Sequence, residues 1–306
     1  VVLLCIALIM FIVYFFMDKK LDAQTGEAEE KDDPFKISDL GKILSSMGFW
    51  LVALLCVLYY SAIFPFQKYA VNMLQCNLTL QLPEQGSFWA GDAVTIVQYI
   101  IMLVVAVFAF VSNFMKKKSL KVSFMCIAGV ALVAYCIMGY MRGTAETIFA
   151  VFPLLAVAIT PILGSYVDRK GKAASMLMIG SLIMIACHLS FAFVLPMFPS
   201  KALAVAIIAI LGVSFSLVPA ALWPSVPKII DERILGSAYC VIFWIQNWGL
   251  LLVPIVIGKV LDATGGYTLP MVIFSSFGVV ALLIGMLLKR EDKKKGYGME
   301  LPNIKE

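Results

Sequence analysis

The sequence carries little charge for its length. Charged residues make up 14% of the 306 residues, apolar side chains make up 62%, and the mean hydropathy is +0.96. Soluble domains hold about 45–50% apolar and about 25% charged residues, so this composition excludes an ordinary soluble domain. The long apolar runs instead predict an all-α, polytopic membrane protein.

Residues that carry catalysis or bind metals are also scarce. The chain has one histidine, His188, and seven cysteines without a C-x-x-C pair, which indicates neither a metal site nor a disulfide framework. The motifs H-E-x-x-H, G-x-S-x-G and G-x-x-x-x-G-K-[ST] are absent. We therefore predict that the protein is not an enzyme and that it uses no cofactor and no metal. We ascribe the net charge of +5 to membrane topology and expect no nucleic-acid partner.

The first apolar run, 1–17, begins at residue 1 with no basic segment before it, unlike a signal peptide. We predict that it is the end of a membrane-spanning helix and that the chain is the C-terminal portion of a longer protein. The following stretch, 18–47, mixes acidic and basic residues. It predicts a cytoplasmic linker that ends in a short amphipathic helix.

Eight further apolar runs each approach the roughly 20 residues that a helix needs to cross a bilayer. They are 48–71, 94–113, 122–141, 146–166, 173–197, 202–223, 237–261 and 268–288. Together with 1–17 they predict nine spans. Residues 48–289 are predicted to form a transmembrane bundle, and residues 290–306 a cytoplasmic tail. If 168–172 is cytoplasmic, 20 of the 24 Lys and Arg residues fall on that side, as the positive-inside rule requires. The other four are Lys68, Arg142, Lys201 and Lys259.

The stretch 164–172, G-S-Y-V-D-R-K-G-K, places four charges and two glycines between two apolar runs. It predicts a tight loop at a membrane face, in which Asp168 accepts hydrogen bonds from helix N-terminal amides or from a neighbouring arginine. The pattern G-x-x-x-D-R-x-G-K between two spans resembles the signature loop of the major facilitator superfamily. The resemblance implies a conformational latch formed by Gly164, Asp168, Arg169, Gly171 and Lys172.

Three other stretches extend this resemblance. The sequences Y-Y-S-A-I-F-P-F-Q-K-Y-A at 59–70, P-A-A-L-W-P-S-V-P at 219–227 and I-Q-N-W-G-L at 245–250 resemble the seventh, tenth and eleventh helices of one branch. That branch contains lysosomal dipeptide transporters and bacterial members. A C-terminal half in this family has six spans after the linker, so we predict that 94–141 is an inserted helical hairpin. The resemblance also implies a six-helix N-terminal half of the same protein as a partner.

Two carboxamides, Gln246 and Asn247, lie about ten residues into the span 237–261, near the middle of the bilayer. A carboxamide in hydrocarbon needs a partner, so we predict that this pair binds a peptide-like substrate or bonds a neighbouring helix.

Tyr60, Phe64 and Lys68 recur every four residues and so share one helical face. We predict that this face and Tyr59 bind substrate, with aromatic walls and an ammonium group that either meets a carboxylate or extends to the interface. Trp223 ends its span where the resemblance implies an inner gate.

Arg142 and Glu146, at i and i+4, predict a surface ion pair.

These observations predict a secondary active or facilitative transporter of a small polar organic solute, with dipeptides as the leading substrate and alternating access as the mechanism. A proton-coupled carrier of sugars, organic anions or drugs is the alternative within this class. A membrane receptor or scaffold that does not transport is the alternative outside it. We expect a multi-pass protein in a lipid bilayer, either a bacterial inner membrane or a lysosomal membrane.

Overall fold

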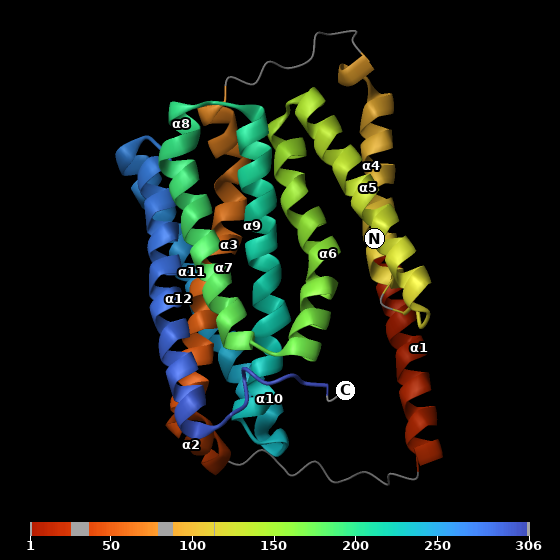
Figure 1. Cartoon of the computed structure of the whole chain (residues 1–306), viewed down its shortest axis with the longest axis vertical. Helices are drawn as coiled ribbons and strands as arrows, with labels where there is room; N and C mark the ends of the chain where they lie inside the picture. The colour runs from red at the N-terminus through yellow and green to blue at the C-terminus, as the bar shows by residue number, and fades with distance from the viewer. Residues whose placement is uncertain (1, 26–36, 79–87, 113, 305–306) are drawn as a thin grey trace. The chain divides into compact units, whose positions relative to one another are not determined.

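The computed structural model describes residues 2–25, 37–78, 88–112 and 114–304, and every regular element in these ranges is a helix (Figure 1). The chain divides into two compact units, 1–41 and 42–306. The first unit contains helix α1 (Val2–Thr25) and most of the short helix α2 (Ile37–Ser45), which lies where the amphipathic helix was predicted. The acidic part of the predicted linker, 26–36, lies outside the described residues.

Eight described helical segments are long and apolar enough to cross a membrane, one for each run predicted after residue 47. The main helices of the second unit are α3 (Met47–Asn77), α4 (Asp92–Ser112), α5 (Lys118–Arg142), α6 (Ala145–Lys170), α7 (Ala173–Leu189), α9 (Lys201–Ala221), α11 (Leu235–Thr264) and α12 (Thr268–Lys295). The short elements are η1 (Phe88–Ala90), the π-helical η2 (Ser190–Val194), α8 (Leu195–Met197), η3 (Trp223–Ser225), α10 (Val226–Ile229) and η4 (Glu232–Ile234). The predicted span 1–17 lies in α1, which is not among the eight.

Local residue chemistry sets the ends of these helices. The Ser46 side chain accepts a hydrogen bond from the amide of Phe49 at the start of α3, and Thr144 does the same for Thr147 at the start of α6. Gly143 and Gly265 end α5 and α11 in the left-handed conformation, which glycine adopts without steric cost. These caps produce the tight turns that make consecutive helices antiparallel.

A six-helix core lies within the second unit. Helix α6 packs against α9, α7 packs against α9 and α12, and α3 packs against α11 and α12. Aromatic rings fill the junction of α3, α7 and α12, where Phe66 stacks on Phe191 with ring centroids 5.4 Å apart. His188 lies beside them, fully buried, with Nδ1 bonded to the carbonyl of Met184. It is therefore a packed residue of the core.

Helices α4 and α5 form a hairpin outside this core. They pack against each other and against α6, beside which they lie in Figure 1. Only 22% of each of their spans is buried, whereas 61% of the α3 span is buried. The hairpin is therefore peripheral to the other six helices, and its status as an insertion stays a prediction.

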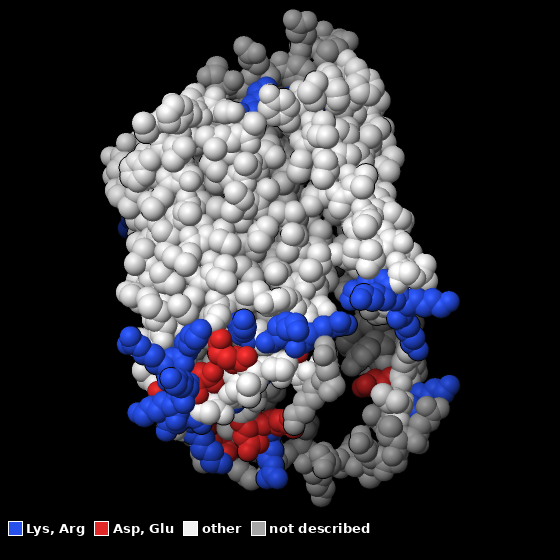
Figure 2. All heavy atoms as spheres, viewed as in Figure 1, with Lys and Arg blue, Asp and Glu red and all other residues white. Residues whose placement is uncertain are grey.

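Basic side chains gather at one end of the second unit, which we call the basic end (Figure 2). This end holds the α4–α5 turn with Lys116, the α6–α7 turn with Arg169 and Lys172, and the end of α12. Arg142 and Lys201 lie at the opposite end. The segments 114–121 and 168–172, both predicted to be cytoplasmic, thus lie at the same end.

Candidate functional site

Five aromatic side chains from four elements form a continuous surface, which we call the aromatic wall. Tyr60 and Phe64 of α3 stack with ring centroids 5.3 Å apart and nearly parallel planes. Phe215 of α9 meets both rings edge to face, at 6.2 and 6.0 Å. Trp223 of η3 contacts Tyr60 at 6.2 Å and Phe243 of α11 at 5.0 Å. The wall thus joins three helices that are far apart in the sequence.

The part of the wall on α3 follows from helical spacing. Residues four apart lie on one face, so Tyr60, Phe64 and Lys68 form a row along α3. Phe64 is 39% exposed and Lys68 is exposed. Pro65 lies inside α3, which remains a continuous α-helix from Met47 to Asn77. The Tyr60–Phe64 stack shows that these two side chains share a face of α3.

Two hydrogen bonds hold the end of the wall nearest the basic end. The indole Nε1 of Trp223 donates to the hydroxyl of Tyr60 at 3.2 Å. The hydroxyl of Tyr239 donates to the carbonyl of Trp223 at 3.1 Å. Trp223 therefore links α3 to α11, where the sequence predicts a gate residue.

The two predicted carboxamides have different surroundings. Gln246 is buried, and its Oε1 accepts a hydrogen bond from the thiol of Cys56 on α3 at 3.0 Å. Asn247 is exposed, and its Nδ2 donates to the carbonyl of Phe243 one turn earlier at 2.8 Å. Gln246 therefore joins two helices, the second of the two roles predicted for it. Asn247 leaves its Oδ1 at the surface, on the same side of α11 as Phe243.

Tyr59 points away from the aromatic wall. Its ring is fully buried, and its hydroxyl bonds to the carbonyl of Leu177 and to Ser181 Oγ, both on α7. Successive residues of a helix point about 100° apart, so the neighbours Tyr59 and Tyr60 face different surroundings. In this structure Tyr59 fixes α3 to α7 and contributes no surface to the wall.

The predicted loop at 164–172 is mostly helical, which corrects the expectation from the sequence. Helix α6 continues to Lys170, because nothing between Gly164 and Lys170 removes a backbone hydrogen bond and open space surrounds Gly164. Only Gly171 and Lys172 form the turn, both with positive φ, at 72° and 63°. Lys172 is the only described residue other than glycine with a positive φ.

The partner of Asp168 also differs from the expectation. Its Oδ1 accepts a hydrogen bond from Nδ2 of Asn303 at 2.8 Å, and its carbonyl accepts from the amides of Asn303 and Ile304. Asn303 belongs to 296–304, which we call the docked segment. Arg169 and Lys172 are exposed. Two parts of the predicted latch, Asp168 and the turn at Gly171, thus contact the same docked segment.

The docked segment caps α7, whose N-cap residue Lys172 makes no side-chain capping bond. The carbonyls of Glu300 and Met299 accept from the amides of Lys172 and Ala173. The carboxylate of Glu300 accepts from Ser175 N at 2.9 Å and from Ser175 Oγ at 2.7 Å. A carboxylate at a helix N-terminus satisfies free amides and complements the helix dipole.

Other contacts hold the docked segment at the basic end. Met299 is fully buried, and its amide donates to Asp292 Oδ1. Lys228 Nζ donates to the carbonyls of Gly298 and Leu301, both at 2.9 Å. The local sequence holds no signal for this segment, because its contacts are long-range and made largely by backbone atoms.

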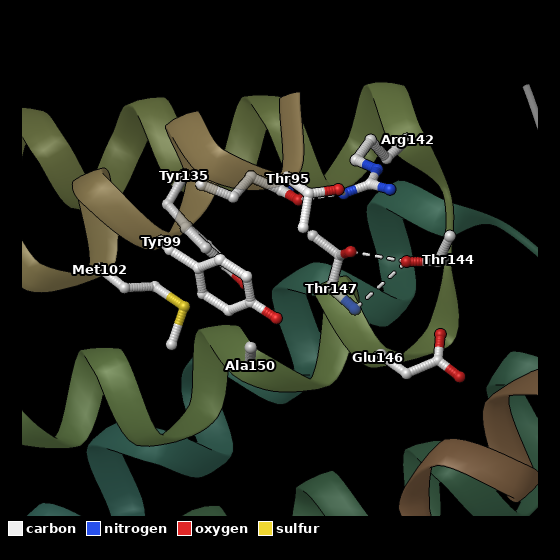
Figure 3. A pocket seen from close by; sticks show the side chains of 10 residues that line it. Thr95, Tyr99, Met102, Tyr135, Arg142, Thr144, Glu146, Thr147 and Ala150 are labelled. Carbon is white, nitrogen blue, oxygen red and sulfur yellow. Dashed lines mark hydrogen bonds between the residues drawn. The ribbon is translucent and has the colours of Figure 1, made fainter. Parts of the chain in front are cut away.

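A cavity of about 380 Å³ lies at the opposite end, between the hairpin and α6 (Figure 3). Arg142 Nη1 donates to Thr95 Oγ1 at 3.0 Å and to Gln98 Oε1 at 2.6 Å, which fastens α5 to α4. Glu146 instead accepts from Gln75 Nε2 at 3.3 Å. The predicted ion pair between Arg142 and Glu146 is therefore wrong, because each side chain finds a partner on another helix.

No group of three or more His, Cys, Asp or Glu side chains in the described ranges is placed to hold a metal ion.

Together these features define an integral, multi-pass, all-α membrane protein. No protein-family model matches the chain.

The chain is similar to vertebrate proteins named lysosomal dipeptide transporter MFSD1. It is 27% identical to the protein from Danio rerio over 296 residues, which are 96% of this chain and 49% of the relative. It is 33% identical to the protein from Bos taurus and 30% identical to that from Homo sapiens, in both cases over 52% of this chain and 32% of the relative. The predicted resemblance to this branch of the major facilitator superfamily is confirmed. The chain spans at most about half the length of these curated relatives.

Proposed function

We propose that the chain forms the C-terminal half of a transporter that moves a small polar organic solute, with dipeptides as the leading substrate, by alternating access. The observation that carries this proposal is the aromatic wall. It crosses α3, α9 and α11, and it lies beside an exposed amide and an exposed lysine. Major facilitators bind substrate near the midplane between two helical halves.

The wall offers groups that suit a peptide. Aromatic faces accept apolar side chains, and the free Oδ1 of Asn247 accepts a hydrogen bond from a peptide N–H. Lys68, one turn beyond Phe64, supplies a cation for a terminal carboxylate. No carboxylate belongs to the wall, so we assign the partner of the substrate's ammonium group to the opposing half.

The exposure of helix α11 favours a protein partner on the side that carries Asn247. Only 17% of its span is buried, the lowest share among the eight. Its exposed residues include Phe243 and Trp248 beside Asn247. A helix with so little cover within the unit needs lipid or protein around it. We propose that the six-helix N-terminal half of the same protein covers the face that carries Asn247.

The turn at Gly171 is proposed as the latch of this half. With it we group Gly164, Asp168, Arg169 and Lys172, of which Arg169 and Lys172 are exposed. Trp223 is proposed as a gate residue because it joins α3 to α11. We place the protein in a bacterial inner membrane, with a lysosomal membrane as the alternative that the names of the relatives supply; imaging of the tagged protein in its host tests this placement.

Uptake of a labelled dipeptide into proteoliposomes that hold the complete protein tests the proposed function. Phe64→Ala and Lys68→Gln should each lower saturable uptake by about five- to thirtyfold, because each removes an interaction on the order of 1–2 kcal/mol. Phe193→Ala and Lys259→Gln are matched controls, since both residues are exposed and lie away from the wall. These controls should retain uptake.

The same assay separates the alternatives. Dependence of uptake on an imposed pH gradient distinguishes proton coupling from facilitated diffusion. Uptake of a sugar or an organic anion in place of dipeptides would move the assignment to another carrier class. Folded protein that takes up none of these solutes would overturn transport and favour a receptor or scaffold.

A further inference from the structure

A second cavity, of about 610 Å³, lies at the basic end between the hairpin and α6. Four cationic side chains line it: Lys116, Lys118 and Lys121 from the α4–α5 turn and the start of α5, and Arg169 from the end of α6. No acidic residue lines it. The cavity therefore concentrates positive charge from two separate parts of the bundle.

The remaining lining is largely apolar. Met115, Val122 and Met125 come from the hairpin, and Pro161 and Ile162 come from α6. Pro161 and Ile162 lie about two turns before Arg169, so this side of the cavity extends from the basic end toward the middle of the spans. The cavity thus combines cationic residues at the basic end with an apolar lining toward the middle of the spans.

The cavity runs from helix ends at the basic end along the apolar part of α6. Its cations lie at the α4–α5 turn, at the start of α5 and at the end of α6, all at the basic end. The N-cap of α5, Lys117, makes no side-chain capping bond, so the first amides of this 25-residue helix add positive partial charge beside the cations. Basic pockets between helices on the cytoplasmic side recognise anionic headgroups.

We propose that this cavity binds an anionic phospholipid of the cytoplasmic leaflet. The headgroup phosphate is held by Arg169 and by the lysines of the hairpin, and an acyl chain lies along Pro161 and Ile162. A bound lipid bridges the hairpin and α6 one residue away from Asp168. The hairpin is not part of the six-helix core, and this proposal gives it a role: it completes a lipid site on α6.

Cys126 provides a direct readout, because it lines this cavity and is exposed. The complete protein is purified in detergent and titrated with short-chain phosphatidylglycerol or phosphatidylcholine. Alkylation of Cys126 by a maleimide is followed by mass spectrometry, with the exposed Cys76 on α3 as an internal reference. Phosphatidylglycerol should protect Cys126 selectively, whereas phosphatidylcholine should not.

Charge-matched variants separate the site from general surface charge. The triple variant Lys116→Gln, Lys118→Gln, Lys121→Gln should raise the concentration of phosphatidylglycerol that half-protects Cys126 on the order of 100-fold, since each cation contributes about a fivefold factor. The control Lys293→Gln, Lys294→Gln, Lys295→Gln removes the same charge from exposed lysines at the end of α12. It should leave protection unchanged.

Three outcomes would overturn the proposal. Equal protection by both lipids would show an apolar groove without headgroup recognition. Equal loss of protection in both triple variants would show attraction by surface charge alone. Protection by soluble glycerol phosphate at the same concentrations would replace the lipid with a free phosphate ester. Buried Cys56 and Cys187 should stay unmodified in each variant, which establishes that the bundle remains folded.

Discussion

Replacing Glu300 with alanine should release the docked segment from α7. The Glu300 carboxylate holds Ser175 through two hydrogen bonds, from N and from Oγ, and it pairs with Lys289 at 3.4 Å. Alanine removes all three interactions and leaves the fully buried Met299 in place. The change therefore tests the cap on α7 separately from the apolar anchor.

The expected magnitude follows from the geometry. A hydrogen bond to a charged group contributes about 1.5–3 kcal/mol. The ion pair adds at most about 1 kcal/mol, because the Lys289 and Glu300 side chains are 47% and 28% exposed and solvent screens the pair. Since the hydrogen bonds are also only partly buried, we expect the docked segment to lose about 3 kcal/mol. At about 1.4 kcal/mol per factor of ten, the segment should open on the order of 100-fold more often.

Hydrogen–deuterium exchange measures this opening directly. The amides of Asn303 and Ile304 donate to the carbonyl of Asp168 and should be protected in the parent protein. In Glu300→Ala their exchange should accelerate on the order of 100-fold. Glu232→Ala, which removes an exposed carboxylate from η4, is the matched control. Unchanged exchange in Glu300→Ala, or equal acceleration in both variants, would refute the argument that Glu300 caps α7.

Two further predictions concern the packing of the six-helix core. Gly212→Ala should destabilise the protein by about 1–3 kcal/mol, because the added Cβ would lie 2.9 Å from the carbonyl oxygen of Phe152 where α9 meets α6; thermal unfolding in detergent measures this loss. The control Gly129→Ala, with no atom within 4 Å, should leave the midpoint unchanged, and equal midpoints for both variants would contradict the close approach. Tyr59→Phe should lower stability by about 1–2 kcal/mol while the KM of dipeptide uptake stays unchanged. The lost hydroxyl bonds to α7 and not to substrate, and Ser181 keeps its own hydrogen bond to the carbonyl of Leu177. A raised KM would show that Tyr59 contributes to the substrate site.

The sequence predicts the helical elements well. Each of the eight apolar runs after residue 47 corresponds to a long helix, because a bilayer demands a minimum length of apolar sequence. Glycine and threonine around residue 143 mark the turn between α5 and α6 correctly. The end of α6 was placed too early, since charged residues at 168–170 continue a helix beyond the apolar run as readily as they begin a loop.

Side-chain surroundings were less predictable. When nearly every residue of a helix is apolar, periodicity separates the lipid-facing side from the packed side poorly. Spacing therefore groups Tyr60 with Phe64, but it does not reveal that the adjacent Tyr59 meets α7. Phe215 and Phe243 join the wall only through contacts between distant helices, for which the local sequence holds no signal.

The docked segment makes many of its contacts through its own backbone. Carbonyls of four successive residues, 298–301, accept hydrogen bonds from the bundle, and three amides donate to it, those of Met299, Asn303 and Ile304. Every amino acid offers a carbonyl, and all except proline offer an amide. Much of this segment can therefore change its side chains in evolution and still follow the same path. Selection should act mainly on Glu300, on the buried Met299 and on Gly171, because a Cβ at position 171 would lie 2.5 Å from the backbone of the docked segment. A comparison of residue identities would therefore understate how many related proteins share the docked segment, whereas a comparison of backbone traces would detect it.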